Sequence, residues 1–339
     1  MISYSEIEIP SRVNHLWRYT PWNRVHPTSV EEVPDVDSIK FSEGTDSDSK
    51  PSDEIARAFL HELVDRANVV SLSDGDEIDL DVRCSGHVCA GELQIQASGK
   101  SSLVVRISGE PGWAGLRIIG DISPNSQLSI AVINDLATDS RLLRADDWIV
   151  GRDSTLEFAN LSSGGFHIKS DARVDLTAQG SSFQAGIAVH GHGSRHDDQH
   201  IEITHSVGHT DSSLVMHAAC GDSSHSIGTG LLTIAEGAND SDAGQLFRNL
   251  LLSENARAEA IPELEVLADE VKAAHGAASA PIDLEQIHYL SSRGLSPSEA
   301  EGIIVEGFLM DAFREIKNDR LIEILRTRLL VHLECLIKG

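Results

Sequence analysis

The sequence predicts a mainly β fold with helical segments at both ends. Between about residues 69 and 281, short runs alternate apolar and polar residues with period two, as at 78–82, 92–96 and 103–107. Gly, Ser, Asp or Asn bounds each run, and no helix-length pattern interrupts most of this span. Many short strands with evenly placed turns fit a sandwich, a barrel or a β-helix.

Turn chemistry helps to separate these alternatives. Sandwich strands usually come with tight hairpins, yet Asp74-Gly75 is the one clear hairpin signal here. The other bends are of the Gly-Asp, Ser-Gly-Gly and Gly-Ser-Ser kind. A solenoid of stacked turns, which buries one continuous core, therefore gains weight. Because aromatic residues make up only 4% of the chain, that core should be mostly aliphatic.

Residues 1–68 should form an N-terminal helical segment with an acidic linker. An aromatic and basic stretch, 16–22, comes first. The acidic, Ser-rich stretch 31–53 has few apolar residues and should be a loop or linker. A helix capped by Ser52 should follow. Its apolar face should hold Ile55, Phe59, Leu60 and Leu63.

Residues 69–281 are then the β core, and residues 282–339 form a C-terminal helical domain. Asp283 begins its first helix. Ser296 and Glu299 make a capping box around Pro297, which marks the start of the second helix. A last helix runs from Asp319 with one apolar stripe, part of which could dock a partner helix or an ATPase. That stripe holds Ile322, Leu325, Leu329, Leu333 and Leu336.

Composition excludes several classes of function. The formal charge of −26 argues against nucleic-acid binding, since phosphate contacts need Lys and Arg. Only seven of the 27 basic residues are lysine, which suggests the hypothesis of a surface suited to high salt. No apolar run is long enough for a membrane span, and the N-terminus lacks a secretory pattern, so we expect a cytoplasmic protein.

The four cysteines do not make a metal site by their spacing. Cys84 and Cys89 are close together in the sequence, but Cys220 and Cys335 are isolated. Reduced, mostly buried thiols are expected, because the usual Cys-x-x-Cys pairs of zinc and cluster sites are absent.

Histidine is the conspicuous feature, because eight of the 16 histidines fall between His190 and His225. A metal site is one interpretation, but the spacing favours solvated or hydrogen-bonded histidines on strands. The sequence has no H-E-x-x-H, no Walker A loop and no G-x-S-x-G elbow. Asp197 and Asp198 are adjacent and would point apart on a strand, which disfavours a β-helix enzyme acting on polysaccharide.

The join between strands and helices carries an ordered series of specific motifs. Leu250-Leu251-Leu252-Ser253-Glu254-Asn255-Ala256 is followed by Pro262-Glu263-Leu264, His275-Gly276-Ala277-Ala278, Ser292-Arg293-Gly294-Leu295 and Glu306-Gly307-Phe308. This series resembles the C-terminal half of the SufB/SufD family of iron–sulfur cluster assembly proteins. Trp17-Arg18-Tyr19-Thr20-Pro21 resembles a short motif near the start of SufD. The good resemblance covers residues 186–316.

The resemblance implies a right-handed parallel β-helix flanked by small N- and C-terminal helical domains. It implies a non-catalytic scaffold subunit, which pairs with a SufB-type subunit through the β-helices and docks a SufC-type ABC ATPase on the C-terminal helices. Arg293, Ile304 and Phe308 are the residues expected to bind SufC. No cofactor is expected to bind this chain tightly, although a nascent Fe–S cluster could be shared with the partner.

The resemblance also indicates the SufD type. Ala256 stands where the SufB type carries its cysteine, and alanine cannot accept sulfur. Gly276 replaces a SufB glutamate, and Ala273 replaces a cysteine that SufD often has. His275 matches the functional histidine of SufD, which could supply a metal ligand at the SufB–SufD interface or orient a sulfur intermediate.

Two alternatives stay open at this point. One is a homodimeric SufB/SufD-like scaffold with its own ligands, Cys220 and the histidines among them. The other is the β-helix enzyme acting on polysaccharide.

Overall fold

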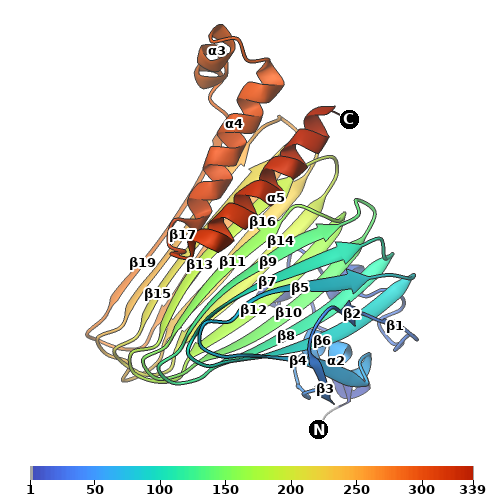
Figure 1. The fold of residues 1–339 in the computed structure, drawn as a ribbon, viewed down its shortest axis with the longest axis vertical. Helices are drawn as coiled ribbons and strands as arrows, with labels where there is room; N and C mark the ends of the chain where they lie inside the picture. Colours follow the sequence, from blue (N-terminus) through green and yellow to red (C-terminus); the bar gives the residue numbers. More distant parts are fainter. Residues whose placement is uncertain (1–2, 339) are drawn as a thin grey trace.

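Two parallel sheets of strands about ten residues long wind into a β-solenoid of about eight turns in the computed structural model, which describes residues 3–338 (Figure 1). Successive strands alternate between the sheets, so each strand pairs with the one two places along the chain. The first sheet contains β4 (Arg66–Leu72), β6 (Val88–Ala97), β8 (Trp113–Ile122), β10 (Arg141–Val150), β12 (His167–Leu176), β14 (His196–His205), β16 (His225–Ile234) and β18 (Arg257–Val266). The second contains β5 (Glu77–Cys84), β7 (Lys100–Gly109), β9 (Gln127–Leu136), β11 (Thr155–Ser162), β13 (Ser182–Gly191), β15 (Asp211–Cys220), β17 (Asp242–Leu251) and β19 (Lys272–Pro281).

Short elements lie at both ends of the chain. The N-terminal ones are η1 (Tyr4–Glu6), η2 (His15–Trp17), α1 (Trp22–Val25), β1 (Asp37–Ser38), β2 (Lys40–Phe41), β3 (Thr45–Asp48) and α2 (Ile55–Glu62). The C-terminal ones are α3 (Leu284–Ser292), α4 (Pro297–Met310), η3 (Asp311–Phe313) and α5 (Asp319–Lys338). The prediction of a parallel β-helix with terminal helices is thus confirmed. None of the helices within residues 3–338 is both long and apolar enough to cross a membrane.

The acidic stretch differs from the expected loop, because it contains three short strands. β2 and β3 pair antiparallel with β5 and β4, and β1 pairs parallel with β6. Main-chain pairing needs few apolar side chains, and Ile39 supplies one that is buried in the core. The α2 helix is capped by Glu54 rather than by Ser52, since the Glu54 carboxylate accepts hydrogen bonds from the amides of Ala56 and Arg57.

The interior of the solenoid is aliphatic only in part. Leu, Ile and Val stack in register over most of it, as expected. A buried polar chain also crosses it, in which Arg144 Nη1 donates to Asn160 (2.8 Å) and Asn160 Nδ2 donates to Gln199 (3.1 Å). Gln199 Nε2 then donates to Asp197 (2.6 Å), which also pairs with Arg195. Each of these buried side chains therefore has at least one hydrogen-bond partner, as a low-dielectric interior requires.

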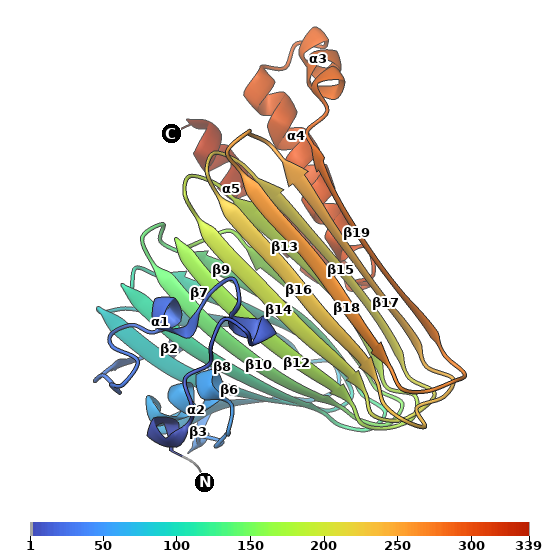
Figure 2. The same ribbon diagram turned by 180° about the vertical axis from the view of Figure 1, so that it is seen from behind.

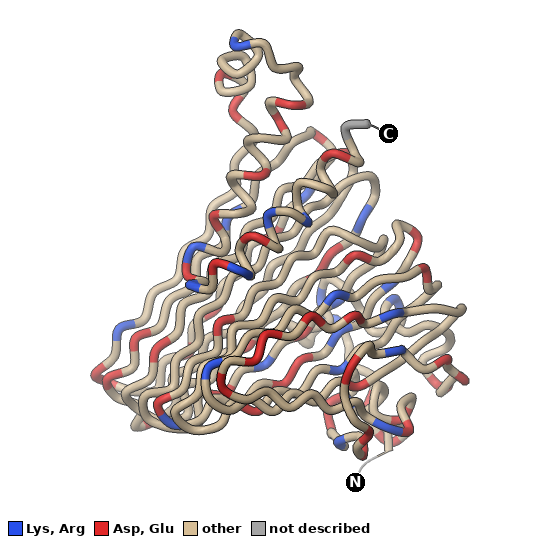
Figure 3. The backbone as a smooth tube through the Cα atoms, in the orientation of Figure 1, with Lys and Arg blue, Asp and Glu red and all other residues tan. Residues whose placement is uncertain are grey.

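The two outer faces are covered by different parts of the chain. The N-terminal segment lies across the first sheet (Figure 2) and packs Trp17, Trp22 and Phe59 against Trp113 and its neighbours. The α4 and α5 helices lie along the second sheet (Figure 1), where an aliphatic cluster holds them. Acidic residues are spread along most of the chain (Figure 3).

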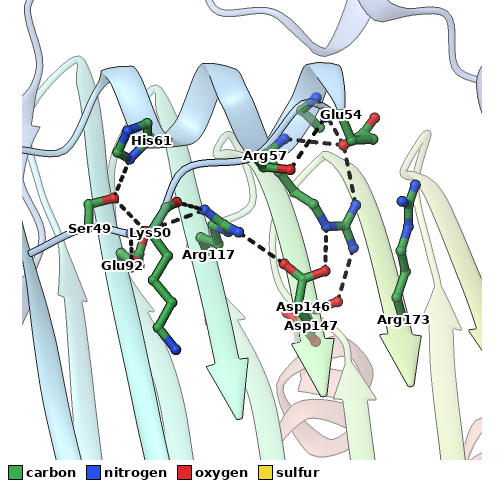
Figure 4. A network of polar contacts seen from close by, with 12 residues as sticks. Ser49, Lys50, Glu54, Arg57, His61, Glu92, Arg117, Asp146, Asp147 and Arg173 are labelled. Carbon is green, nitrogen blue, oxygen red and sulfur yellow. Dashed lines mark hydrogen bonds and ion pairs between the residues drawn. The ribbon is translucent and has the colours of Figure 1, made fainter. Parts of the chain in front are cut away.

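Buried charge fastens α2 to the first sheet (Figure 4). Arg57 Nε donates to Asp147 (2.6 Å), and its other nitrogens reach Asp171 and the carbonyl of Asp146. Arg117 joins the same Asp147 carboxylate at 3.2 Å. Burial alone would raise the pKa of Asp171, but the adjacent Arg57 guanidinium outweighs it and holds that pKa well below its usual value. Asp171 therefore stays ionised in the folded protein.

Candidate functional site

The last turn of the solenoid is left open. β18 and β19 each pair on one side only, with β16 and β17, and no other strand within residues 3–338 covers their free edges. No residue of either strand is buried, whereas most residues of β16 are. Each sheet therefore presents ten residues of unpaired main chain. Such an edge is a template for pairing with another chain.

His275 lies on β19 and is exposed at this open end. It is in register with Gln245 on β17, so their side chains share one face of the second sheet. Gln245 is buried, and its Nε2 donates to the Glu263 carbonyl of β18 at 2.6 Å. Its Oε1 has no hydrogen-bond partner among the described residues. The imidazole thus lies beside an unused acceptor at the mouth of the solenoid.

Ala256 lies in the turn just before β18, so it belongs to the same last turn as His275. Its methyl group is buried and packs into the solenoid core. Ser253, earlier in this turn, is occupied by a hydrogen bond from its Oγ to the Asp222 carbonyl (2.6 Å). The turn therefore offers no thiol.

The four cysteines of the chain do not place an accessible thiol at the open end either. Cys220 is fully buried, and burial raises the pKa of its thiol, which makes it a poor nucleophile. Cys84 and Cys89 lie at the opposite end of the solenoid, and Cys335 is exposed on α5. Within residues 3–338, no three His, Cys, Asp or Glu side chains are arranged to hold a metal ion.

The histidine-rich stretch separates into groups with different surroundings. His196 and His225 share an outward-facing row with His167, because the three are in register on β12, β14 and β16. His190 lies against α5, where its Nδ1 is 2.9 Å from Nε2 of His332. Burial, followed by the neighbouring histidines and Arg195, lowers the pKa of His190 well below its usual value.

The remaining histidines of that stretch also have local roles. His205 is buried between the hydroxyls of Thr210 (2.7 Å) and Ser212 (2.8 Å). His200 contacts Thr229 (2.7 Å) and Glu202 (3.2 Å). These contacts are those of hydrogen-bonded strand histidines.

The three residues expected to bind an ATPase lie in different settings. Arg293 caps the end of α3 and lies over the Tyr289 ring, 5.0 Å from its centroid. Ile304 is partly buried on α4 and lines a hollow of about 380 Å³ beside Tyr289. Phe308 turns inward: its ring stacks on His217 at 4.6 Å, and its carbonyl accepts from His217 Nδ1 at 2.7 Å. Phe308 thus anchors α4 to the solenoid.

The exposed apolar surface of these helices lies elsewhere. α3 projects beyond the solenoid (Figure 1) and buries none of its residues. Leu284 is 75% exposed and Tyr289 57% exposed, and Ile303 on α4 is 48% exposed. Leu284 is the first residue after the Asp283 cap and faces outward.

Comparison with known proteins gives consistent matches. The family model described as "SUF system FeS cluster assembly, SufBD core domain" matches residues 110–308, more than half of the chain. An iron–sulfur cluster assembly SufBD family protein of Mycobacterium leprae is 25% identical over 360 residues, covering 96% of this chain and 90% of its own. SufD of Bacillus subtilis is 34% identical over 167 residues, 49% of this chain and 38% of its own. SufD of Escherichia coli is 25% identical over 212 residues, 62% of this chain and 49% of its own.

Proposed function

Because the chain belongs to the SufBD core domain family of the SUF system for FeS cluster assembly, we propose that it is a SufD-type scaffold subunit. In this proposal it pairs with a SufB-type subunit through the open end of its solenoid and docks a SufC-type ATPase on its C-terminal helices. The chain turns over no substrate of its own. It works in the cytoplasm, since its four free thiols suit a reducing compartment.

The open end is the observation that carries the proposal. β19 exposes a full strand edge with one charged residue, Lys272, whereas β18 carries four charged residues and Pro262, which restrict pairing at its own edge. β19 in particular is lined by alanines, with one lysine at its start. Small side chains let a second solenoid end approach closely, so that main-chain hydrogen bonds can continue across the interface.

The side chains at the open end of the solenoid could supply only part of the ligands that a cluster needs. The exposed imidazole of His275 can offer a nitrogen ligand, while the buried Ala256 offers no sulfur. A cluster forming here needs thiolates from a neighbouring subunit, and a SufB-type chain is the partner that the family resemblance suggests. The cluster is cargo in this scheme, held between two chains before it is passed on.

The C-terminal helices support the docking of an ATPase. Leu284, Tyr289 and Ile303 expose large apolar surface that the chain itself leaves uncovered. Arg293, stacked on Tyr289, adds a cation at the rim of the same surface. An apolar patch with a polar rim is the usual composition of a protein interface.

A homodimeric scaffold is the second candidate, and the same open end favours it. Two copies could pair β18 and β19 with each other across a two-fold axis. Such a dimer would still lack an accessible thiol at the interface, since Cys220 is fully buried. Its ligands would have to come from histidines such as His275.

Reconstitution of the cluster tests the proposal. The purified chain, alone or with its SufB-type and SufC-type partners, is supplied with iron and sulfide, and bound iron and acid-labile sulfide are measured. We expect a stoichiometric cluster only in the full complex. A stoichiometric cluster on the isolated chain would refute the SufD assignment.

His275→Ala sharpens this test. It should leave the complex intact but lower the cluster yield severalfold, because one nitrogen is removed from the shared site. His87→Ala is the matched control, because His87 is exposed in the turn between β5 and β6, far from the last turn. Equal yields from the two variants would remove His275 from the site.

A further inference from the structure

A second hollow lies on the outer face of the first sheet, where the N-terminal segment crosses it. It has a volume of about 420 Å³ and lies between the residues that follow α1 and the first residues of β10, β12 and β14. Nine residues line it, and none is acidic. Its chemistry comes from Arg24, Arg141, His167 and His196, with Phe166 on one side. This is unusual in a chain of net charge −26.

The two arginines have no carboxylate partner among the described residues. Arg141 is held in place by its Nη2, which donates to the carbonyls of Val25 (3.5 Å) and His26 (3.4 Å) and also to that of Arg24. Its Nε and Nη1 have no acceptor within residues 3–338. The Arg24 side chain is exposed at the rim of the hollow. Two guanidinium groups at this hollow therefore have N–H groups that are free to donate hydrogen bonds to a ligand.

Two acidic residues on β14, beside the hollow, already have partners. Asp198 receives hydrogen bonds from Lys169 Nζ (3.0 Å) and from the hydroxyl of Thr20. Asp197 points into the solenoid, where Arg195 and Gln199 satisfy it. The charge of Glu32 acts on His26, which lines the hollow, but no carboxylate of the described residues pairs with Arg24 or Arg141.

One of the two histidines adds a directed donor. His167 stacks on His196 with ring centroids 4.8 Å apart, and His196 is held by Thr20 Oγ1 at 2.8 Å. Burial, and then the charges of His196, Arg141 and Arg24, lower the pKa of His167 to about 3. A neutral imidazole beside two cations keeps one N–H to donate, and an anion would relieve the repulsion that the cations impose.

From these contacts we propose that the hollow is a binding site for a small phosphate-bearing molecule. Arginine forks match the oxygens of a phosphate group, and they bind it through charge-assisted hydrogen bonds. The hollow is larger than a single phosphate needs, and Phe166, 45% exposed, offers a flat apolar surface for an organic part. The site is separate from the open end of the solenoid and does not depend on the role proposed for that end.

Isothermal titration of the full chain at constant ionic strength tests this site, with adenosine monophosphate, inorganic phosphate and adenosine as probes. We expect saturable binding of one adenosine monophosphate, weaker binding of phosphate and no binding of adenosine. Phosphate binding as tight as that of the nucleotide would overturn the part assigned to Phe166. Absence of saturable binding of both phosphate-bearing probes would overturn the site itself.

Variants identify the groups responsible. Arg24→Gln should weaken nucleotide binding at least tenfold without changing the melting temperature, because this side chain is exposed. Phe166→Ala should weaken the nucleotide but not phosphate. Arg83→Gln is the matched control and should bind like the parent chain, since Arg83 is a 73% exposed arginine on β5. Unchanged affinity in Arg24→Gln would contradict the proposal.

Discussion

The two ends of the solenoid are built from the same strand unit but are finished differently. At the first turn, the antiparallel strands β2 and β3 pair with two residues of β5 and four residues of β4, and α2 packs on the outer face of the first sheet. At the last turn, β18 and β19 end the sheets without a cover among the described residues. One end is closed by the chain itself, and the other is left for a partner.

The difference lies in the path of the flanking chain. The acidic N-terminal stretch folds back over the first turn, where its main-chain groups form hydrogen bonds with the strands of that turn. The chain that leaves β19 instead turns along the outer face of the second sheet as α4 and α5 (Figure 1).

The forces that fasten the flanking segments differ as well. The N-terminal segment is held by an aromatic cluster and by buried charge, since Arg57 pairs with Asp171. Lys169, itself paired with Asp198, donates to the Leu16 carbonyl (3.0 Å). The C-terminal helices are held by aliphatic packing, by ion pairs such as that of Arg320 with Asp79, and by the contact of His332 with His190. Loss of a buried charge should therefore loosen α2, and acid should loosen α5.

Arg57→Ala should produce the largest loss of stability. Arg57 is 2% exposed, and its removal leaves the buried Asp171 with a poorly compensated charge. Breaking a buried pair in this way costs about 3–5 kcal/mol. Urea denaturation measures the change. Arg66→Ala is the matched control, because Arg66 pairs with the 94% exposed Asp48 and should cost at most about 1 kcal/mol. Similar losses in both variants would mean that the network does not anchor the first end.

Ala277→Glu should show whether the open end, and not the closed end, binds the SufB-type partner. Ala277 is exposed on β19, so the isolated chain should fold normally with a glutamate there. A desolvated, unpaired carboxylate in the interface should weaken binding of a SufB-type partner by about 100-fold or more. Thr45→Glu places the same charge on the exposed strand β3 at the closed end and should leave binding unchanged. Surface plasmon resonance compares the two, and equal affinities would show that the open end is not the interface.

Sequence patterns predict the repeating unit better than they predict its ends. Period-two alternation and the turn residues predicted short strands and gave weight to a solenoid, and the family resemblance then specified the parallel β-helix. The pairing of β2 and β3 uses main-chain groups in an acidic stretch, which no apolar pattern reveals. Sequence alone could therefore not show which end is closed.

The candidate site shows the same limit. His275 was identified from a family resemblance, and its exposure depends on the missing cover over β19. The row of histidines did have a signal in the sequence, because His167, His196 and His225 are spaced 29 residues apart, one solenoid turn each. The inward orientation of Phe308 had no signal in the sequence. The helical pattern shows that Phe308 lies on an apolar face, but it does not show whether that face packs on the solenoid or on a partner protein.

Mild acid should loosen α5, while the Arg57–Asp171 pair that fastens α2 persists. Burial, followed by His192 and two arginines, lowers the pKa of His332 to about 3, below the value of about 6.5 of an unfolded histidine. The stability that neutral His332 contributes is present above pH 6.5 and is lost as the pH falls toward 3, because the unfolded state binds the proton first. At pH 5 the loss is about 2 kcal/mol. Asp171 stays ionised at this pH, since Arg57 holds its pKa low against the effect of burial, so α2 should remain attached.

Hydrogen exchange at pH 7.5 and pH 5, corrected for intrinsic rates, measures this difference between α5 and α2. Protection should fall in Asp319–Lys338 and persist in Ile55–Glu62. His332→Gln keeps a hydrogen-bonding group beside His190 but cannot take up a proton, so it should remove most of the acid effect on α5. Equal loosening of α5 in this variant and the parent chain would mean that aliphatic packing alone sets the stability of the helices beside the open end.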